Sequence, residues 1–439
     1  MTATIQDVLA RVDVEKTIKR TLDLANVESP TGFEGECAEL YARMMEEVGM
    51  RVKLQEVEQG RYNAVGILPG KGGGPSLMFN GHLDTSFSPR EPPEILRAIS
   101  PVYRLEPPWA YREGEWLYGM GVFNMKGALA AYISAVEALQ NAGVELKGDI
   151  MTAGVVGEIE KTQVDQYKGS QYRGYGTGTA YLVTHGGVTD FAVLGEPTGL
   201  RLMLTHFGSV WAKIYLKGQM VHTAHSAGLT NLILQMNRVL NVLEGWIPAY
   251  QERFSFNGVK PTVNIGSIEG GWPWRCSRTP WFCNLYVDLR YPPPYSAVDV
   301  KEALEEMLDI VQQRYGFRPN LDIYVSDAWA HVPEDAAVVK AIDNAHRTVF
   351  GAPAERVVFS WSSDANVLTR NGVVAVNYGP SGGPGKEMRG TLYIPNLIAC
   401  TKVYSIAAMD LCNQDRKKVK REFTIKYGGL RWAGISDSL

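Results

Sequence analysis

Acids and a histidine follow three apolar segments in the first half of the chain. His82 and Asp84 close the segment SLMFNGHLDT, Glu158 and Glu160 close MTAGVVGEIE, and Glu196 closes FAVLGEPT. If these segments are strands of one open α/β sheet, their carboxyl ends meet at the edge where such sheets bind ligands. Imidazole and carboxylate groups transfer protons and bind divalent cations. The sequence therefore predicts a proton-transfer or metal site at this edge.

The His82–Asp84 spacing fits such a site. Residues two apart on a strand face the same side, and a carboxylate beside a histidine fixes its tautomer and orientation. A His-x-Asp pair also occurs by chance in surface turns, so the pair gains meaning only from the other two strand ends.

The elements that must position these residues alternate between helix and strand. Helical patterns cover 4–25, 34–49 and 124–142, and strand patterns cover 51–58, 63–70 and 75–84. The alternation returns over 334–439. This order predicts an α/β fold in which a mixed sheet carries helices on both faces.

The middle of the chain has a different order. Strand, helix, strand, strand, helix and strand patterns follow one another from 205 to 327, which is the ferredoxin-like order β-α-β-β-α-β. We expect an inserted small domain over 204–325, and a larger catalytic domain built from 1–203 and 326–439.

Composition excludes several classes of protein. The chain has 439 residues and a net charge of −3, and it lacks the basic stripe of a nucleic-acid-binding protein. It contains no apolar run of about 18 residues, so we expect no membrane partner. The start shows no pattern of a signal peptide. The five cysteines form no C-x-x-C pair, which favours reduced thiols and a cytoplasmic protein.

Several motifs occur in an order that resembles a known family. They are GHLDT, YGMGVFNMKGALAAYISA, GVVGEIE, FAVLGEPT, YLKGQMVHTAHSAGLTNLI and SSDANVLTRNGVVAVNYGPSG. The ordered set resembles the aminoacylase, carboxypeptidase G, acetylornithine deacetylase and succinyl-diaminopimelate desuccinylase family of metallopeptidases. The resemblance implies hydrolysis of an amide bond in a small N-acyl or carboxylate-bearing substrate, and a homodimer formed through the inserted lid domain.

The family's two-metal site is only partly matched. His82 corresponds to its first histidine and Glu196 to the glutamate of its Glu-Pro-Thr motif. Asn124 stands where the family has the aspartate that bridges the two metals. Ile159 stands where it has a second glutamate, and a shifted alignment would place Glu160 there instead. The C-terminal histidine has no counterpart, Glu387 and Met388 being the nearest residues.

These replacements predict a degenerate metal site. A neutral amide offers one oxygen and no charge, so Asn124 cannot screen the repulsion between two close dications. We expect at most one loosely held divalent ion, zinc or manganese, on His82, Glu196 and Asn124, or none. A site normally needs three good protein ligands to hold zinc.

The groups for proton transfer are retained. By resemblance, Glu158 is the general base, Asp84 is the acid behind the first metal-binding histidine, and His222 is the lid histidine that stabilises the oxyanion across the dimer. Asn264, Arg290 and His225 are candidate substrate contacts, although ordinary lid surface residues would explain them as well. The segment 161–178 is longer than the family's usual link and either remodels the cleft or is a surface loop.

Three functions remain open at this point. The first is a hydrolase that uses Glu158 and depends weakly, or not at all, on metal. The second is a non-catalytic protein that keeps the pocket and binds a small molecule. The third is a lyase or isomerase that reuses Glu158 for proton transfer. Retention of Glu158 favours the first and third functions over the second.

Overall fold

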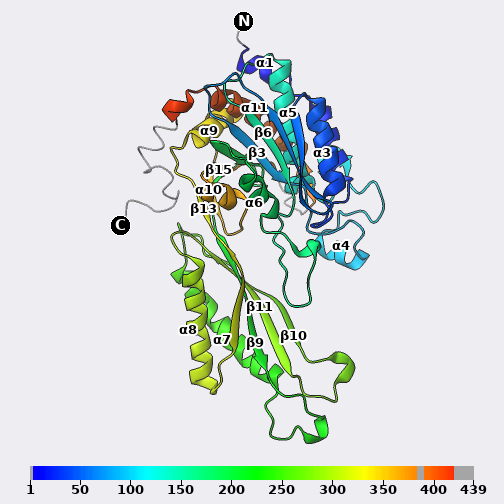
Figure 1. Cartoon of the computed structure of the whole chain (residues 1–439), viewed down its shortest axis with the longest axis vertical. Helices are drawn as coiled ribbons and strands as arrows, with labels where there is room; N and C mark the ends of the chain where they lie inside the picture. Colours follow the sequence, from blue (N-terminus) through cyan, green and yellow to red (C-terminus); the bar gives the residue numbers. More distant parts are fainter. Residues whose placement is uncertain (1–2, 383–389, 420–439) are drawn as a thin grey trace. The chain divides into compact units, whose positions relative to one another are not determined.

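The chain forms two compact units in a computed structural model that describes residues 3–382 and 390–419. The first unit comprises Met1–Leu204, His331–Val357 and Ser363–Leu439, and the second comprises Thr205–Ala330 and Val358–Ser362 (Figure 1). The second unit therefore ends five residues beyond the expected 325 and takes in a short later segment, 358–362.

A mixed sheet is the centre of the first unit. Its order is β1-β2-β6-β3-β7-β15-β8-β13, and β14 also pairs with β8. The strands are β1 Arg51–Glu58, β2 Arg61–Leu68, β3 Leu77–His82, β6 Ile150–Val155, β7 Phe191–Leu194, β8 Leu202–His206, β13 Ala330–His331, β14 Arg356–Phe359 and β15 Val374–Asn377. Strands β6, β3, β7 and β15 run parallel, whereas β1, β2 and β6 pair antiparallel. A small second sheet has the order β16-β5-β4, with β4 Tyr111–Glu113, β5 Trp116–Tyr118 and β16 Thr391–Tyr393.

Helices cover both faces of the main sheet, as alternate residues of β3 show. Phe79 stacks on Tyr132 of α5 with ring centroids 5.0 Å apart, while the next residue, Asn80, donates a hydrogen bond of 3.3 Å to Thr179 of α6. Since successive side chains of a strand point to opposite faces, α5 and α6 lie on opposite sides. The helices of the unit are α1 Ile5–Leu9, α2 Val14–Ala25, α3 Gly35–Glu47, α4 Pro93–Ile99, α5 Gly127–Asn141, α6 Thr177–Thr184, α9 Ala337–Phe350, α10 Ala365–Arg370 and α11 Ile394–Cys412. The predicted fold class is confirmed.

Two expected helices differ in their bounds. The segment 4–25 contains two helices, because Asp13 accepts a hydrogen bond from the backbone N–H of Lys16 and so starts α2 as a new helix. The helix expected over 124–142 begins at Gly127, since Asn124 and Met125 have non-helical backbone angles within the π-helical turn η1, Val122–Lys126. The peptide bond between these two residues is cis.

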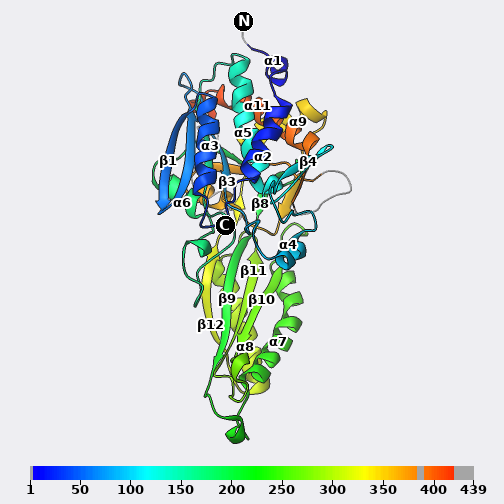
Figure 2. The same cartoon turned by 90° about the vertical axis from the view of Figure 1, so that its right-hand side faces the viewer.

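The second unit has the predicted ferredoxin-like order. Its elements are β9 Gly208–Lys217, α7 Leu232–Arg253, β10 Val263–Gly270, β11 Phe282–Tyr291, α8 Ala297–Tyr315 and β12 Asn320–Asp327. The sheet order is β10-β11-β9-β12 with antiparallel pairing, and α7 and α8 pack together on one face (Figure 2). Met236, Leu243, Leu285 and Leu304 belong to its own buried core, separate from that of the first unit.

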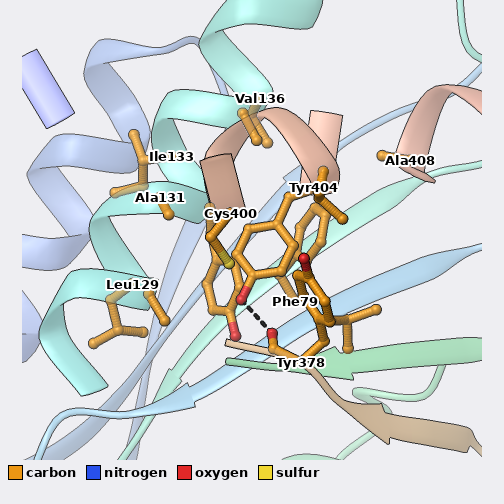
Figure 3. Packing of buried hydrophobic residues seen from close by; sticks show 14 of the residues in the cluster. Phe79, Leu129, Ala131, Ile133, Val136, Tyr378, Cys400, Tyr404 and Ala408 are labelled. Atoms are coloured by element: carbon orange, nitrogen blue, oxygen red, sulfur yellow. Dashed lines mark hydrogen bonds between the residues drawn. The ribbon is translucent and has the colours of Figure 1, made fainter. Parts of the chain in front are cut away.

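An aromatic cluster joins the helices α5 and α11 to β3 in the first unit. The ring centroids of Phe79, Tyr132 and Tyr404 lie 5.0–5.4 Å from one another. Tyr404 lies beside Phe79 and donates a hydrogen bond of 2.6 Å to the carbonyl oxygen of Tyr378 (Figure 3). Tyr132 donates to the carbonyl oxygen of Asn80 at 2.9 Å. Each buried hydroxyl is therefore paired, and the cluster fixes β3 two residues before His82.

The Tyr404 hydroxyl should contribute measurably to stability. In Tyr404→Phe the buried carbonyl of Tyr378 loses its donor, so we expect the free energy of unfolding to fall by about 1–2 kcal/mol. Chemical denaturation measures this change. Tyr393→Phe is the matched control, because its hydroxyl bonds Glu115 at an exposed position and its loss should cost less than about 0.5 kcal/mol. Equal stability of the two variants would contradict the prediction.

Candidate active site

The site lies at the carboxyl ends of three adjacent parallel strands. His82 is the last residue of β3, Glu158 follows β6 by three residues, and Glu196 follows β7 by two. Because β6 and β7 pair with β3 on either side, these ends reach one edge of the sheet. One ligand atom from each of the three side chains lies within 4.8 Å of the others. The structure thus brings together one imidazole and two carboxylates.

Asp84 holds the turn that carries Glu158. Its carboxylate is fully buried and accepts hydrogen bonds from the backbone N–H of Glu158 at 3.1 Å, from that of Ile159 at 3.3 Å and from the Thr31 hydroxyl at 2.8 Å. Burial alone would raise the pKa of Asp84, but the charge of His82 and these hydrogen bonds outweigh it, and the pKa lies below its usual range. Asp84 is therefore an ionised anchor.

His82 meets an oxygen at each ring nitrogen. Its Nδ1 lies 2.8 Å from the backbone carbonyl oxygen of Asp84, and its Nε2 lies 3.0 Å from Oδ1 of Asn124 and 3.7 Å from Oε2 of Glu158. Burial lowers the pKa of His82, yet the charges of Glu158, Glu196 and Asp84 raise it well above its usual value. An imidazolium donates at both nitrogens, whereas the neutral ring donates at one.

The two glutamates resist ionisation. Burial and the charge of Glu196 raise the pKa of Glu158 well above the usual range, with His82 opposing them. Burial also raises the pKa of Glu196. A carboxyl group with a raised pKa keeps its proton closer to neutral pH, which suits proton transfer there.

Asp364 is a further acid near this site, and no sequence motif assigns it a role. This buried residue immediately precedes α10 and accepts a hydrogen bond of 2.5 Å from the Thr179 hydroxyl, which in turn accepts one from Asn80. Burial raises the pKa of Asp364 to about 7, although the bond from Thr179 opposes the shift, and the charge of Asp364 contributes to the raised pKa of Glu158. Asp364 precedes a helix instead of following a strand, so the pattern of polar residues at strand ends does not include it.

Other predicted residues lie elsewhere. Ile159 donates its backbone N–H to Asp84, and Glu387 and Met388 lie outside the described residues. In the second unit, His222 and His225 are exposed near the short 3-10 helix Thr223–His225.

Two further candidates lie on strands of the second unit. Asn264 is exposed on β10. Arg290 is buried on β11 and donates to Asp288 on the same strand at 2.8 and 3.1 Å. Their roles as substrate contacts remain predictions.

The donor set fits one divalent cation. His82, Glu196 and Glu158 supply one nitrogen and carboxylate oxygens, and the amide oxygen of Asn124 lies 3.0 Å from the same ring nitrogen of His82. Three protein ligands of these types are what a catalytic zinc site uses. Glu158 is therefore a further candidate metal ligand, beside the predicted ligands His82, Glu196 and Asn124.

A mixed α/β sheet that carries these side chains at its strand ends is thus interrupted by a ferredoxin-like unit. The chain belongs to peptidase family M20/M25/M40, whose family model matches residues 78–410. It is therefore an enzyme of the class that hydrolyses amide-type C–N bonds.

Relatives and solved structures agree with this family. Acetylornithine deacetylase of Yersinia pseudotuberculosis is 28% identical over 304 residues, which cover 64% of this chain and 68% of the relative. The Photorhabdus laumondii enzyme of the same name is 26% identical and covers 72% and 76%. A di-peptidase structure from Saccharomyces cerevisiae matches with a TM-score of 0.73 at 12% identity, over 94% of this chain and 100% of that chain. Human carnosine dipeptidase 1 matches with a TM-score of 0.70 at 16% identity, over 93% and 99%. These two structures share the fold.

The site should take up no more than one divalent cation, and Asn124 should limit its affinity. We expect at most one equivalent of zinc or manganese by metal analysis, removable by a chelator. In Asn124→Asp a second oxygen and a charge are added beside His82, so we expect at least about tenfold tighter binding, a gain of about 1.4 kcal/mol. Two tightly held equivalents in the natural protein would contradict the prediction, as would unchanged affinity in the variant.

Proposed function

We propose that this protein hydrolyses the amide bond of a small N-acyl or carboxylate-bearing compound, with Glu158 as the general base and with weak or absent metal dependence. The position of Glu158 carries the proposal. Its backbone is held by Asp84, its carboxylate lies 3.7 Å from His82, and its raised pKa suits a base that acts near neutral pH.

The chain's own residues supply the proton transfers. Ionised Glu158 takes a proton from water as the water attacks the scissile carbonyl, and it then returns that proton to the leaving nitrogen. His82, drawn into the cationic form by three carboxylates, offers a positive charge beside the developing oxyanion. Asp84 holds His82 through its backbone carbonyl and the backbone of Glu158 through its carboxylate.

With a divalent cation bound, His82 would be a neutral ligand beside Glu196 and Asn124, and the metal would replace the charge of the imidazolium by polarising the scissile carbonyl as a Lewis acid. Glu158 cannot bind a cation tightly and also act as a free base, so we assign it to proton transfer. That assignment leaves one imidazole, one carboxylate and one neutral amide as ligands, which supports weak metal dependence.

His222 is proposed as a further oxyanion donor. The backbone N–H of Ala224 donates to its Nδ1 at 3.2 Å, so the proton of the neutral ring belongs on Nε2, the nitrogen that remains free to donate. By the family resemblance, this histidine would serve the site of the partner in a homodimer. Asn264, Arg290 and His225 are proposed substrate contacts from the same unit.

The names of the relatives support a substrate class. Two acetylornithine deacetylases, which by name remove an acetyl group from an amino acid, match more than 60% of the chain. We therefore propose N-acyl amino acids as the first compounds to assay, followed by dipeptides and other small amides. A lyase or isomerase would instead convert such a compound without releasing a carboxylic acid.

We also propose a homodimer in the cytoplasm. The apolar side chains Ile265 and Ile268 are 41% and 51% exposed on β10, the edge strand of the second unit's sheet. An exposed apolar edge strand is a favourable surface for pairing with another copy. All five cysteines are free thiols, which agrees with a reducing compartment. Within residues 3–382 and 390–419, no helix is long and apolar enough to span a bilayer.

Replacement of Glu158 should separate activity from stability. In Glu158→Gln we expect the turnover number to fall by at least about 10²-fold, because the base is lost. The natural enzyme should lose activity as the pH falls through the raised pKa of Glu158, above the usual carboxyl range. The measurement is kcat against pH, with Glu160→Gln as the matched control.

The same variant should become relatively more stable at high pH. The folded protein binds the Glu158 proton more tightly than the unfolded chain does, so ionisation costs stability as the pH rises. The neutral amide of the Glu158→Gln variant does not ionise, so the free energy of unfolding of this variant should fall less as the pH rises. Denaturation at several pH values measures this difference. Full turnover in this variant would remove Glu158 from the mechanism.

Charge on the β10 edge should dissociate the dimer. In Ile268→Lys an ammonium group replaces an apolar side chain in the proposed interface, so we expect monomers at micromolar concentrations in analytical ultracentrifugation. Val298→Lys is the control, since Val298 is 63% exposed on α8 of the same unit. A natural protein that sediments as a monomer would contradict the dimer.

A further inference from the structure

Arg61 is a buried arginine whose every N–H group has an acceptor. It is the first residue of β2 and is fully buried. Its Nε and Nη2 each donate a hydrogen bond to Glu34, at 2.9 and 2.6 Å, and its Nη1 donates one to Glu58 at 2.9 Å. The two remaining hydrogens reach the backbone carbonyl oxygens of Ser170 at 3.4 Å and Arg173 at 3.1 Å. Both of these carbonyls belong to the long segment 161–178.

The chain leaves the sheet after Val155, and the end of this segment returns against residues 157–161. The backbone N–H of Gly174 donates to Lys161 at 3.1 Å, that of Tyr175 to Ile159 at 3.3 Å, and that of Thr177 to Gly157 at 3.1 Å. A side chain at Gly174 would place its Cβ only 1.8 Å from the carbonyl oxygen of Ile159. The two arms are therefore in close contact, and a shift of the returning arm moves the residues around Glu158.

The guanidinium of Arg61 also touches the residue before Glu158. Gly157 has a φ of +63°, and a Cβ built there would lie 2.7 Å from Nη2 of Arg61 and 2.6 Å from the carbonyl oxygen of Arg173. Only a glycine allows this approach without displacing one of them. Arg61 thus packs against Gly157 while it holds the arm that returns to Gly157.

We propose that Arg61 is a positioning residue for Glu158. It fixes the Gly157 turn from one side, through contact with Gly157 and its bonds to the returning arm, while Asp84 fixes the turn through the N–H groups of Glu158 and Ile159. The two ionised groups hold the carboxylate of the base at the sheet edge. This inference rests on the proposed function, because it assigns Glu158 the role of base.

A purely structural role for Arg61 would have a different outcome. A buried ion pair that only stabilises the fold would change the free energy of unfolding and leave kcat in the folded fraction unchanged. A positioning residue changes kcat with KM nearly unaltered, since it alters the placement of the base and not the contacts with substrate.

Two substitutions test the inference from opposite sides of the contact. Arg61→Lys keeps the charge but removes the fork that serves Glu34 and the two carbonyls. Gly157→Ala keeps every charge and presses a methyl group against the guanidinium. Gly143→Ala is the matched control for backbone strain, because Gly143 has a φ of +71° and a Cβ there meets nothing within 4 Å. Arg20→Lys controls for loss of a buried arginine, since Arg20 bonds Ser134 and Glu137 instead.

We expect kcat on an N-acyl amino acid to fall about 10- to 100-fold in both test variants, with KM within about twofold, because a base displaced by about 1 Å loses that much. The controls should stay within about twofold of the natural enzyme. The double variant should lose little more than either single one, as residues acting through one contact are non-additive. Additive losses, or a folded Arg61→Lys protein with the natural kcat, would overturn the inference.

Hydrogen exchange keeps the inference separate from the proposed function. The amides of Glu158, Ile159 and Thr177 should exchange at least about tenfold faster in both test variants than in the controls, whether or not any substrate turns over. Unchanged exchange would overturn the proposed positioning role of Arg61. A natural protein that hydrolyses none of the assayed amides would instead refute the proposed function, and the exchange data would still decide the role of Arg61.

Discussion

The buried carboxylate of Asp84 is the interaction on which the site depends. It lies two residues beyond His82, the last residue of β3 that pairs with β6, where the two strands separate. By accepting the N–H groups of Glu158 and Ile159 it extends the link between the strands into the loop. The backbone carbonyl of the same residue orients His82. One residue therefore aligns the imidazole and the acid.

The two faces of β3 have different roles, because one packs in the apolar core and the other carries the polar side chains of the site. Phe79 and Gly81 face the helices α5 and α11, where packing is dense enough that a Cβ at Gly81 would lie 2.7 Å from Met125. Asn80 and His82 face the other side, where polar groups are hydrogen-bonded to one another. The packing of the apolar face makes the strand rigid. The rigid strand holds the polar side chains of the other face in place.

Much of the fold could be predicted from the sequence because its patterns are local. The strand over 51–58 and the β-α-β-β-α-β order follow from period and turn signals, and the strand-end rule found His82, Glu158 and Glu196. Asp364 and Arg61 could not be found in this way. Each acts through partners more than 25 residues away in the chain, Thr179 and Glu34 respectively, and no spacing in the sequence encodes such contacts.

The crowding of acids has a consequence for any calorimetric study. Glu158, Glu196 and Asp364 have raised pKa values, so part of this group carries protons near neutral pH. A cation that enters, whether a metal ion or a substrate ammonium group, favours the ionised carboxylates and expels those protons to the solvent. The observed heat of binding will then include the ionisation heat of the buffer, and apparent affinity will increase as the solution becomes more alkaline.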